Sequence, residues 1–251
     1  MHILGIDIGG TGIKGAPVDI ESGKLLDERL RIPTPQPATP ENVIETVAEI
    51  ARSFNWKEPI GCGFPAAIKN ETVMTASNID RSWIGLNAGE KIGNQVNCPV
   101  HLVNDVDAAG LAEATFGAGR DKQGVVIVAA VGTGIGTALF TDGKLVPNTE
   151  LGHILLNGMV AEKYVSNAVR KNEELTWEEF GKRLNEYLNR LDFLFWPDAI
   201  ILGGGASKKF ELFKDYLDLA DKIEPAMLLN NAGIVGAALS AKEIGIALNY
   251  K

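Results

Sequence analysis

A segment that occurs twice is the feature that most constrains how this chain can fold. Residues 2–26 (HILGIDIGGTGIKGAPVDIESGKLL) are typical of a strand, a glycine-rich turn and a returning strand. Residues 125–146 (VVIVAAVGTGIGTALFTDGKLV) have the same layout. Two shorter motifs recur inside them: GTGI at 10–13 and 132–135, and GKL at 23–25 and 143–145. The repeat indicates two copies of one supersecondary unit, each opening one half of the molecule.

Strands and helices alternate in the rest of the sequence. Apolar spacing and capping signals predict helices over 40–54, 107–116, 176–194 and about 232–248, and strands over 60–68, 99–103 and 199–202. Such alternation indicates an α/β fold. The repeat predicts two lobes facing across a cleft: an N-terminal lobe of residues 1–120, with helix 238–251 packing on it, and a C-terminal lobe of residues 121–237.

Charge and cysteine content exclude several classes of protein. The 251 residues carry a net charge of −8, which disfavours general nucleic-acid binding because phosphate contacts need clustered Lys and Arg. The two cysteines, Cys62 and Cys98, are far apart and form neither a disulfide framework nor a metal-binding spacing. No apolar run reaches the ~18 residues of a membrane span. A cytoplasmic protein with two buried free thiols is expected.

The first glycine turn carries the residues of a phosphate site. Glycines let backbone amides approach an anion closely, and Thr11 and Lys14 add side-chain donors beside Gly9, Gly10 and Gly12. Asp7, at the end of the first strand, is a hard oxygen ligand suited to Mg²⁺. The alternative is a plain tight hairpin. The turn is neither a Walker loop nor a dinucleotide fingerprint, because no helix follows it.

Two further glycine turns are candidates for the same kind of site. The second copy keeps Gly132, Thr133, Gly134 and Gly136 but has Ala129 at the position expected to match Asp7 and Gly136 in place of Lys14. Only the first copy therefore offers a metal ligand and a cation. A third turn, residues 203–209 (GGGASKK), predicts a helix with lysine at its start. Its candidates for a phosphate or nucleotide wall are Gly204, Gly205 and Lys208.

A pair of acids follows the strand predicted over 99–103. Asp105 lies where ligands of open α/β sheets bind, at a strand's carboxyl end. Either Asp105 or Asp107 could instead cap the next helix. We expect Asp107 to be the cap and Asp105 to point into the cleft, where a carboxylate can take the proton of a hydroxyl group during phosphoryl transfer.

Glu150 and His153 lie three residues apart in the run ELGH. This spacing places a carboxylate and an imidazole close together on a turn. They could bind sugar hydroxyls or a metal, but the spacing of zinc-binding HExxH motifs is absent. Sugar binding is the favoured interpretation.

These segments together resemble the ROK family of sugar kinases and, within it, the polyphosphate glucokinases. The resemblance covers almost the whole chain. It rests on the runs DIGGTGIKGAPVD, GFPAAI, SNIDRSWIG, LVNDVDAAG, VGTGIGTALF, ELGH, LTWEEF, FLFWPDAIILGGGASKK and NNAGIVGAAL. The resemblance implies an actin-like ATPase (ribonuclease H-like) fold and a homodimer.

The same resemblance implies roles for individual residues. Asp105 would be the catalytic base, Asp7 would lie near Mg²⁺, and the glycine turns would hold the phosphate donor. Glucose would be bound by Asn78, Asn104, Asp105, Glu150, His153 and Glu162. The run ILLNGMVAE at 154–162 lacks the cysteines of the zinc segment found in many ROK kinases, so no zinc is expected.

The implied reaction is phosphorylation of glucose to glucose 6-phosphate with polyphosphate, and also ATP, as donor. A long polyanion needs a basic track, for which the candidates are Lys14, Arg170, Lys171, Lys182, Arg183, Lys208 and Lys209. Three alternatives remain: a strictly ATP-dependent hexose or aminosugar kinase, a non-catalytic sugar sensor, and an actin-like filament or chaperone ATPase. Retention of Asp7, Lys14 and Asp105 disfavours the sensor, and the ELGH run disfavours the filament.

Overall fold

The computed structural model describes residues 1–77 and 79–249, which form two compact units. The first unit comprises residues 1–112 and the chain from Asn230 onward, and the second comprises Glu113–Leu229. Boundaries at residues 120 and 237 are expected from the sequence. In the structure the first boundary falls within α3 (Asp105–Phe116), and the second lies before α8 (Ala232–Ser240), which belongs wholly to the first unit.

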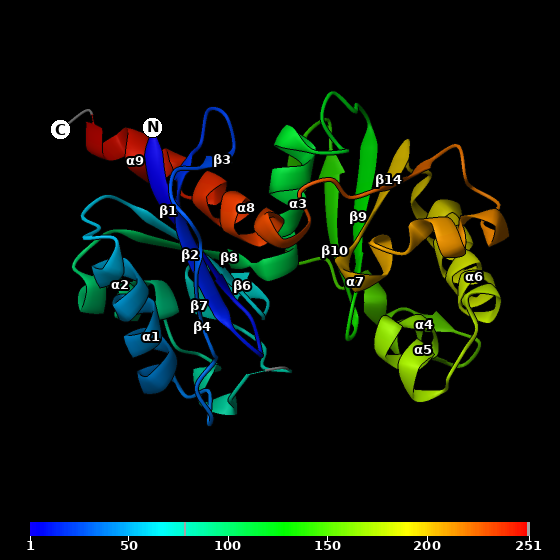
Figure 1. Ribbon diagram of the computed structural model, residues 1–251, viewed down its shortest axis with the longest axis horizontal. Coiled ribbons are helices and arrows are strands. Elements are labelled where there is room, and N and C mark those ends of the chain that lie inside the picture. Colours follow the sequence, from blue (N-terminus) through cyan, green and yellow to red (C-terminus); the bar gives the residue numbers. More distant parts are fainter. Residues whose placement is uncertain (78, 250–251) are drawn as a thin grey trace. The chain divides into compact units, whose positions relative to one another are not determined.

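The first unit is built on a mixed sheet of order β3-β2-β1-β5-β8, with β4 paired to β2 (Figure 1). Its strands are β1 (His2–Ile8), β2 (Ile13–Asp19), β3 (Lys24–Leu25), β4 (Leu30–Ile32), β5 (Ile60–Phe64) and β8 (Val100–Asn104). β1 and β2 are antiparallel, whereas β1, β5 and β8 are parallel. The carboxyl ends of the three parallel strands therefore meet at one edge of the sheet.

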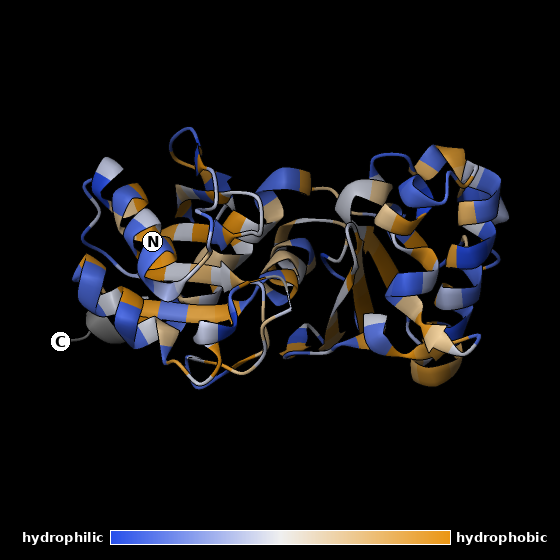
Figure 2. Ribbon diagram, turned by 90° about the horizontal axis from the view of Figure 1, so that it is seen from below, coloured by the Kyte–Doolittle hydropathy of each residue, from blue (hydrophilic) through white to orange (hydrophobic). Residues whose placement is uncertain are grey.

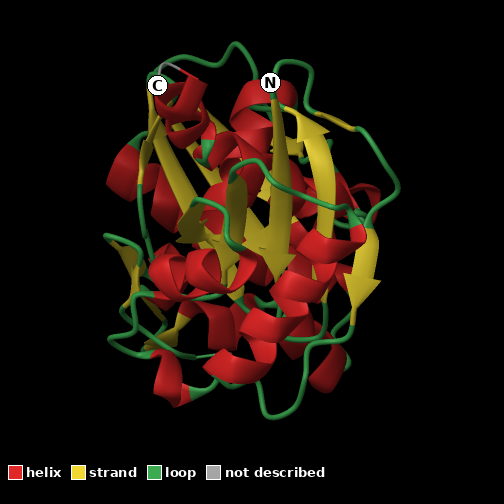
Figure 3. Cartoon of the chain, turned by 90° about the vertical axis from the view of Figure 1, so that its left-hand side faces the viewer, coloured by secondary structure: helices red, strands yellow, loops and turns green. Residues whose placement is uncertain are grey.

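Helices cover both faces of this sheet (Figure 3). On one face, α1 (Pro40–Ser53) brings Ile50 against Gly15, and with α2 (Ala88–Val96) it closes a core around Leu4, Ile6 and Ile8. On the other face the backbone of α8 lies against the backbone of β5. Gly61 allows this close approach, since a Cβ atom there would collide with the carbonyl oxygen of Ala237. The helix expected over 232–248 is interrupted at Ala241 and continues as α9 (Lys242–Asn249).

The strand expected over 60–68 is wrong in its length. β5 ends at Phe64, and Ile68 belongs to a separate hairpin of β6 (Ile68–Lys69) and β7 (Thr72–Val73). Pro65 follows β5 directly and has no amide hydrogen to donate to a neighbouring strand. A turn results, in which Ala66 N donates to Phe64 O (2.8 Å).

The second unit contains a sheet of order β11-β10-β9-β14-β15, whose strands are mostly orange in the hydropathy colouring of Figure 2. The strands are β9 (Val125–Val131), β10 (Ile135–Thr141), β11 (Lys144–Val146), β14 (Ala199–Gly203) and β15 (Ile223–Pro225), and a separate hairpin consists of β12 (Leu155–Leu156) and β13 (Met159–Val160). Its helices are α4 (Ala161–Val165), α5 (Asn167–Asn172), α6 (Trp177–Phe195) and α7 (Gly204–Ser207). Short 3₁₀ turns cover Leu151–His153, Phe210–Leu212 and Lys214–Tyr216 in this unit, Arg81–Trp83 in the first unit, and Leu229–Asn231 at the boundary between them in the chain.

The long helix α6 forms where the sequence predicts it. Thr176 and Glu179 make the expected capping box, in which each side chain accepts a hydrogen bond from the other residue's backbone amide. One face of the helix is buried against the sheet, with Phe180, Leu184 and Leu188 in the core of the unit. Among the described residues, no helix has both the length and the apolar character that crossing a membrane requires.

The predicted repeat is confirmed as two hairpins, β1–β2 and β9–β10, whose four strands each have seven residues. The turn between the strands is one residue shorter in the second copy, since residues 9–12 separate the first pair and residues 132–134 the second. Asp7 pairs with Lys14, and Ala130 pairs with Gly136. Ala130, and not Ala129, therefore occupies the position of Asp7.

Both cysteines are free and buried, as expected, with Cys62 fully buried and Cys98 only 6% exposed. Burial raises the pKa of both thiols. Because the thiolate is the nucleophile, we expect neither cysteine of the folded protein to react with iodoacetamide at pH 8, and both to react in denaturant. Intact mass spectrometry measures the adducts. Rapid labelling of the folded chain would contradict the burial of these thiols.

Candidate functional site

The predicted site residues fall into two sets, one in each unit. The first unit holds Asp7, Gly9, Gly10, Thr11, Gly12, Lys14, Asn104 and Asp105. The second unit holds Gly132, Thr133, Gly134, Gly136, Glu150, His153, Glu162, Gly204, Gly205 and Lys208. The predicted sugar ligand Asn78 lies outside the described residues.

In the first unit, Asp7 and Asp105 lie at the same edge of the sheet. Asp7 is in register with Gly63 of the neighbouring strand β5. A Cβ atom on Gly63 would lie 3.5 Å from Cα of Asp105, so a single glycine position separates the two acids. This edge is formed by the carboxyl ends of β1, β5 and β8, where open α/β sheets bind ligands.

Asp7 forms an ion pair with Lys14 directly across the β1–β2 hairpin. Lys14 Nζ lies 2.9 Å from Asp7 Oδ2, and the side chains are 27% and 18% exposed, respectively. Partial burial makes this contact stronger than one in open solvent. The predicted metal ligand and the predicted cation of the turn are thus held next to each other.

Sequence reasoning missed the amino end of α8 as a neighbour of Asp7. A Cβ atom on Gly233, the second residue of α8, would lie 2.9 Å from Cγ of Asp7, so the carboxylate rests against the helix start. The amino end of a helix carries partial positive charge and favours an adjacent anion. The only signal in the sequence is Gly233 near the beginning of a predicted helix, which does not reveal its partner.

The first glycine turn is closed by local hydrogen bonds. Gly9 N donates to Gly12 O (3.2 Å), and Thr34 Oγ1 donates to Gly9 O. Gly10 and Thr11 lie exposed at the tip of the turn. This is a compact, exposed backbone loop of the kind that can accommodate a phosphate group.

Asn104, and not Asp107, caps helix α3. Asn104 Oδ1 accepts hydrogen bonds from Val106 N (2.9 Å) and Asp107 N (3.0 Å), and its Nδ2 donates to Ala66 O (3.1 Å). The helix starts at Asp105, two residues before the expected start, and Asp107 is fully buried. The expectation that Asp107 is the cap is therefore wrong. Asp105 lies in the first turn of the helix and is partly exposed.

In the second unit, Glu150, His153 and Glu162 gather around the start of β10. His153 Nδ1 lies 3.4 Å from Glu150 Oε2, and both side chains are about half exposed. Gly152, between them, packs directly against the carbonyl of Ile135. Glu162 Oε2 accepts a hydrogen bond from Ile135 N (3.4 Å). Glu150, His153 and Glu162 thus lie beside the end of the second glycine turn.

The second and third glycine turns are neighbours. Gly132 N donates to Gly134 O (2.9 Å), which closes the second turn. Gly204 has a φ of +74°, and a Cβ atom there would lie 2.6 Å from Val131 O at the end of β9. The two turns, with Gly205 and Thr133 exposed, therefore form one backbone surface.

The helix after the third turn is shorter than expected. α7 begins at Gly204 and ends at Ser207, so Lys208 lies at its carboxyl end. The expectation of a lysine at the start of this helix is wrong, because the glycines themselves form the first turn of the helix.

Several residues predicted to form a basic track have other contacts. The guanidinium of Arg170 lies 4.2 Å over the ring of Trp177. Lys182 pairs with Glu178 (2.7 Å), and Arg183 pairs with Glu173 (2.8 Å). Arg170, Lys182 and Arg183 therefore each have a partner within the second unit.

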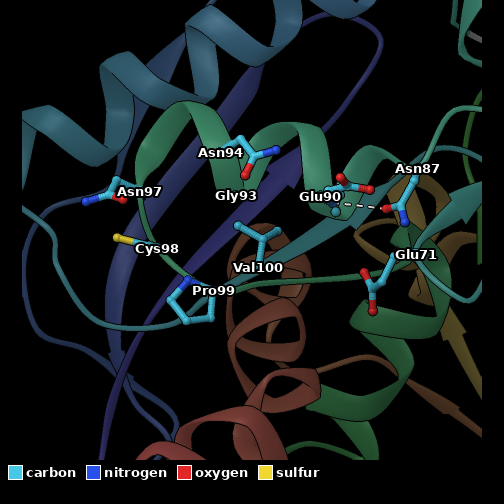
Figure 4. Close-up of a pocket in the computed structure, with 10 residues that line it drawn as sticks. Glu71, Asn87, Glu90, Gly93, Asn94, Asn97, Cys98, Pro99 and Val100 are labelled. Carbon is cyan, nitrogen blue, oxygen red and sulfur yellow. Dashed lines mark hydrogen bonds between the residues drawn. The ribbon is translucent and has the colours of Figure 1, made fainter.

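A pocket of about 600 Å³ in the first unit lies away from these residues (Figure 4). Its lining includes Glu71, Glu90, Asn94 and Val100. Val100 is the first residue of β8, whereas Asn104 ends the same strand. The pocket is therefore at the opposite end of β8 from Asp105 and contains none of the predicted site residues.

Comparison with known proteins agrees with the resemblance described above. The model of the ROK family matches residues 3–167. The polyphosphate glucokinase of Mycobacterium tuberculosis (strain CDC 1551 / Oshkosh) is 42% identical over 241 residues, covering 96% of this chain and 91% of the relative. The prediction of an enzyme of the polyphosphate glucokinase type is thus confirmed.

Two solved structures are similar over nearly the whole chain. The inorganic polyphosphate/ATP-glucomannokinase from Arthrobacter sp. strain KM has a TM-score of 0.90 and 46% identity, covering 99% of both chains. A ROK family glucokinase from Streptomyces griseus, in complex with glucose and AMPPNP, has a TM-score of 0.82 and 26% identity, covering 97% of this chain and all of the other. The predicted actin-like fold class is confirmed. The chain belongs to the ROK family.

Proposed function

We propose that this protein transfers the terminal phosphoryl group of inorganic polyphosphate, or of ATP, to the 6-hydroxyl of glucose. The observation that carries the proposal is the position of Asp105 at the sheet edge that also holds Asp7, Lys14 and the first glycine turn. A carboxylate beside a phosphate-binding turn suits a reaction between a hydroxyl group and a phosphoryl group.

Asp105 acts as the general base in this proposal. A carboxylate oxygen of Asp105 accepts the proton of the 6-hydroxyl while the sugar oxygen bonds to the terminal phosphorus. The bond between that phosphorus and the bridging oxygen breaks, and the shortened donor leaves with the electron pair. Lys14 and the amides of residues 10–12 stabilise the negative charge on the transferred group.

Asp7 would hold Mg²⁺, since its carboxylate is an oxygen ligand beside the turn. Oδ2 of Asp7 accepts a hydrogen bond from Lys14 Nζ. The described residues contain no group of three or more His, Cys, Asp or Glu side chains that could hold a metal ion. This donor set fits an ion that is bound mainly by substrate phosphates. When bound, Mg²⁺ neutralises charge on the donor phosphates. That the protein needs no zinc stays a prediction.

We propose Asn78, Asn104, Asp105, Glu150, His153 and Glu162 as the glucose ligands, and the turns at 132–134 and 203–205 as a surface for the donor. Glu150 and His153 support this proposal because they form an exposed acceptor–imidazole pair that can share sugar hydroxyls. A homodimer is also expected, which light scattering can check.

His153→Gln is expected to raise the KM for glucose about tenfold or more, because a hydrogen bond to a substrate hydroxyl is lost. His153 is half exposed, so the thermal midpoint should stay unchanged. Steady-state kinetics and calorimetric titration of glucose measure the effect. His2→Gln, at an exposed position of β1, is the matched control. An unchanged KM in the His153 variant would remove this residue from the sugar site.

The function is tested by a coupled assay for glucose 6-phosphate with polyphosphate and ATP supplied separately. We expect product with polyphosphate and none after Mg²⁺ is chelated. Product with ATP but not with polyphosphate would assign the protein to the strictly ATP-dependent hexokinases. No product from glucose, mannose or an aminosugar with either donor would indicate a non-catalytic sugar-binding protein.

A further inference from the structure

Two arginines, Arg31 in the edge strand β4 and Arg29 just before it, extend the first phosphate turn. Asp7, Lys14 and Arg31 occupy consecutive register positions across β1, β2 and β4. Residues directly opposite each other in antiparallel strands project from the same face, so the three side chains form a row. Neighbouring strands are about 4.8 Å apart, and Arg31 therefore places a second positive charge one strand beyond Lys14.

The guanidinium of Arg31 is held at the turn itself. Its Nη2 donates to Thr11 O (3.1 Å). A Cβ atom on Gly12 would lie 2.8 Å from Arg31 Nε, so the guanidinium occupies the space beside Gly12 that a side chain would need. Arg31 is otherwise exposed, whereas the flanking Leu30 and Ile32 pack against the core.

Arg29 is anchored in a similar way near the start of α8. Its Nη1 lies 3.3 Å from Asn230 O and 3.5 Å from Oδ1 of Asn231, the residue that precedes α8. Both arginines are thus fixed by neutral oxygen atoms. Within residues 1–77 and 79–249 neither forms an ion pair with a carboxylate, so both keep the capacity to bind an anion.

We propose that Arg31, assisted by Arg29, binds donor phosphates beyond the third and so favours polyphosphate over ATP. This inference rests on the proposed function. The triphosphate of ATP ends in a nucleoside, whereas polyphosphate continues as a chain of charged groups. A guanidinium presents several N–H donors in a fork that matches phosphate oxygens. Lys14 and the turn bind the transferred end of the chain, while Arg31 at the outer side of the turn and Arg29 beyond it continue the positive charge toward the part of the donor that ATP lacks.

A purely structural role for Arg31 predicts a different result. If Arg31 only held the turn in shape, its loss would lower the thermal midpoint and reduce kcat with every donor. If it binds distal phosphates, the loss raises KM for long donors and leaves kcat and the thermal midpoint unchanged. The split between KM and kcat therefore separates the two roles.

The test compares Arg31→Gln with the wild type on polyphosphate of several tens of units, tripolyphosphate and ATP. We expect the KM for the long chain to rise about tenfold, a typical effect of losing one phosphate contact, with less than twofold change for the other two donors. Adding Arg29→Gln to this variant should raise the KM for the long chain further and change the KM for tripolyphosphate and ATP less than twofold. Arg120→Gln, which removes an exposed arginine of the second unit, is the matched control and should change nothing.

Three results would overturn the inference. The first is an unchanged KM for the long chain, and the second is an equal rise in the KM for ATP or tripolyphosphate. The third is a lower kcat with every donor together with a lower thermal midpoint. Failure of the proposed function is distinct, because it is seen in the wild type. A wild-type protein that does not use polyphosphate refutes the proposed donor before any variant is made. A wild type that uses polyphosphate together with an unaffected Arg31 variant refutes only the role of Arg31.

Discussion

Asp105→Asn is expected to lower kcat for glucose phosphorylation by about 10²–10⁴-fold, the usual contribution of a general base. The amide cannot accept the proton of the 6-hydroxyl at neutral pH, although it has nearly the shape of the carboxylate. Its oxygen can still accept the hydrogen bond that Val106 N donates to Asp105 Oδ1 (3.0 Å). The start of α3 should therefore stay intact, and Asn104 continues to cap it.

Two measurements separate loss of the base from loss of the site. Calorimetric titration should show glucose affinity close to that of the wild type, and the thermal midpoint should be unchanged. A single-turnover experiment with saturating donor gives the rate of the chemical step. A variant that turns over within threefold of the wild type would exclude Asp105 as the base.

Lys14→Met is expected to lower kcat/KM by about 10²–10³-fold with both donors, the usual effect of losing one preorganised donor to developing charge. The variant also leaves the partly buried Asp7 carboxylate without its cation. Some loss of stability should follow, since an uncompensated charge in a partly buried position is unfavourable. Kinetics with each donor and thermal denaturation measure the two effects.

Two further variants define what Lys14 contributes. Lys14→Arg keeps the charge and should recover part of the lost activity. Lys24→Met removes an exposed lysine from β3 of the same sheet and should have no effect. Activity of the Lys14→Met variant near that of the Lys24→Met control would show that the first turn does not bind the transferred phosphate.

Local signals explain which features the sequence predicts well. The hairpins around the glycine turns, helix α1 from Pro40 and the capping box of α6 each depend on residues close together in the chain. Family resemblance adds the fold class. It also groups Asp7, Lys14 and Asp105 in one function, and the register of β1, β2 and β5 places them at one sheet edge.

Long-range geometry explains what the sequence could not reveal. The one-residue difference between the two turns, which aligns Ala130 with Asp7, is visible only in the strand register. The approach of α8 to Asp7 and the row that ends in Arg31 join segments distant in the chain. It is equally hard to predict which of several neighbouring polar residues caps a helix. In α3 the cap is Asn104, whose Oδ1 accepts a hydrogen bond from Asp107 N, and not Asp107.

The most direct test of the central claim is ³¹P NMR of the purified protein with glucose, polyphosphate and Mg²⁺. We predict a growing resonance of glucose 6-phosphate and an equal loss of phosphoryl groups from polyphosphate, with little free orthophosphate. Release of orthophosphate without a sugar phosphate, or phosphorylation at a hydroxyl other than the 6-hydroxyl, would contradict the account.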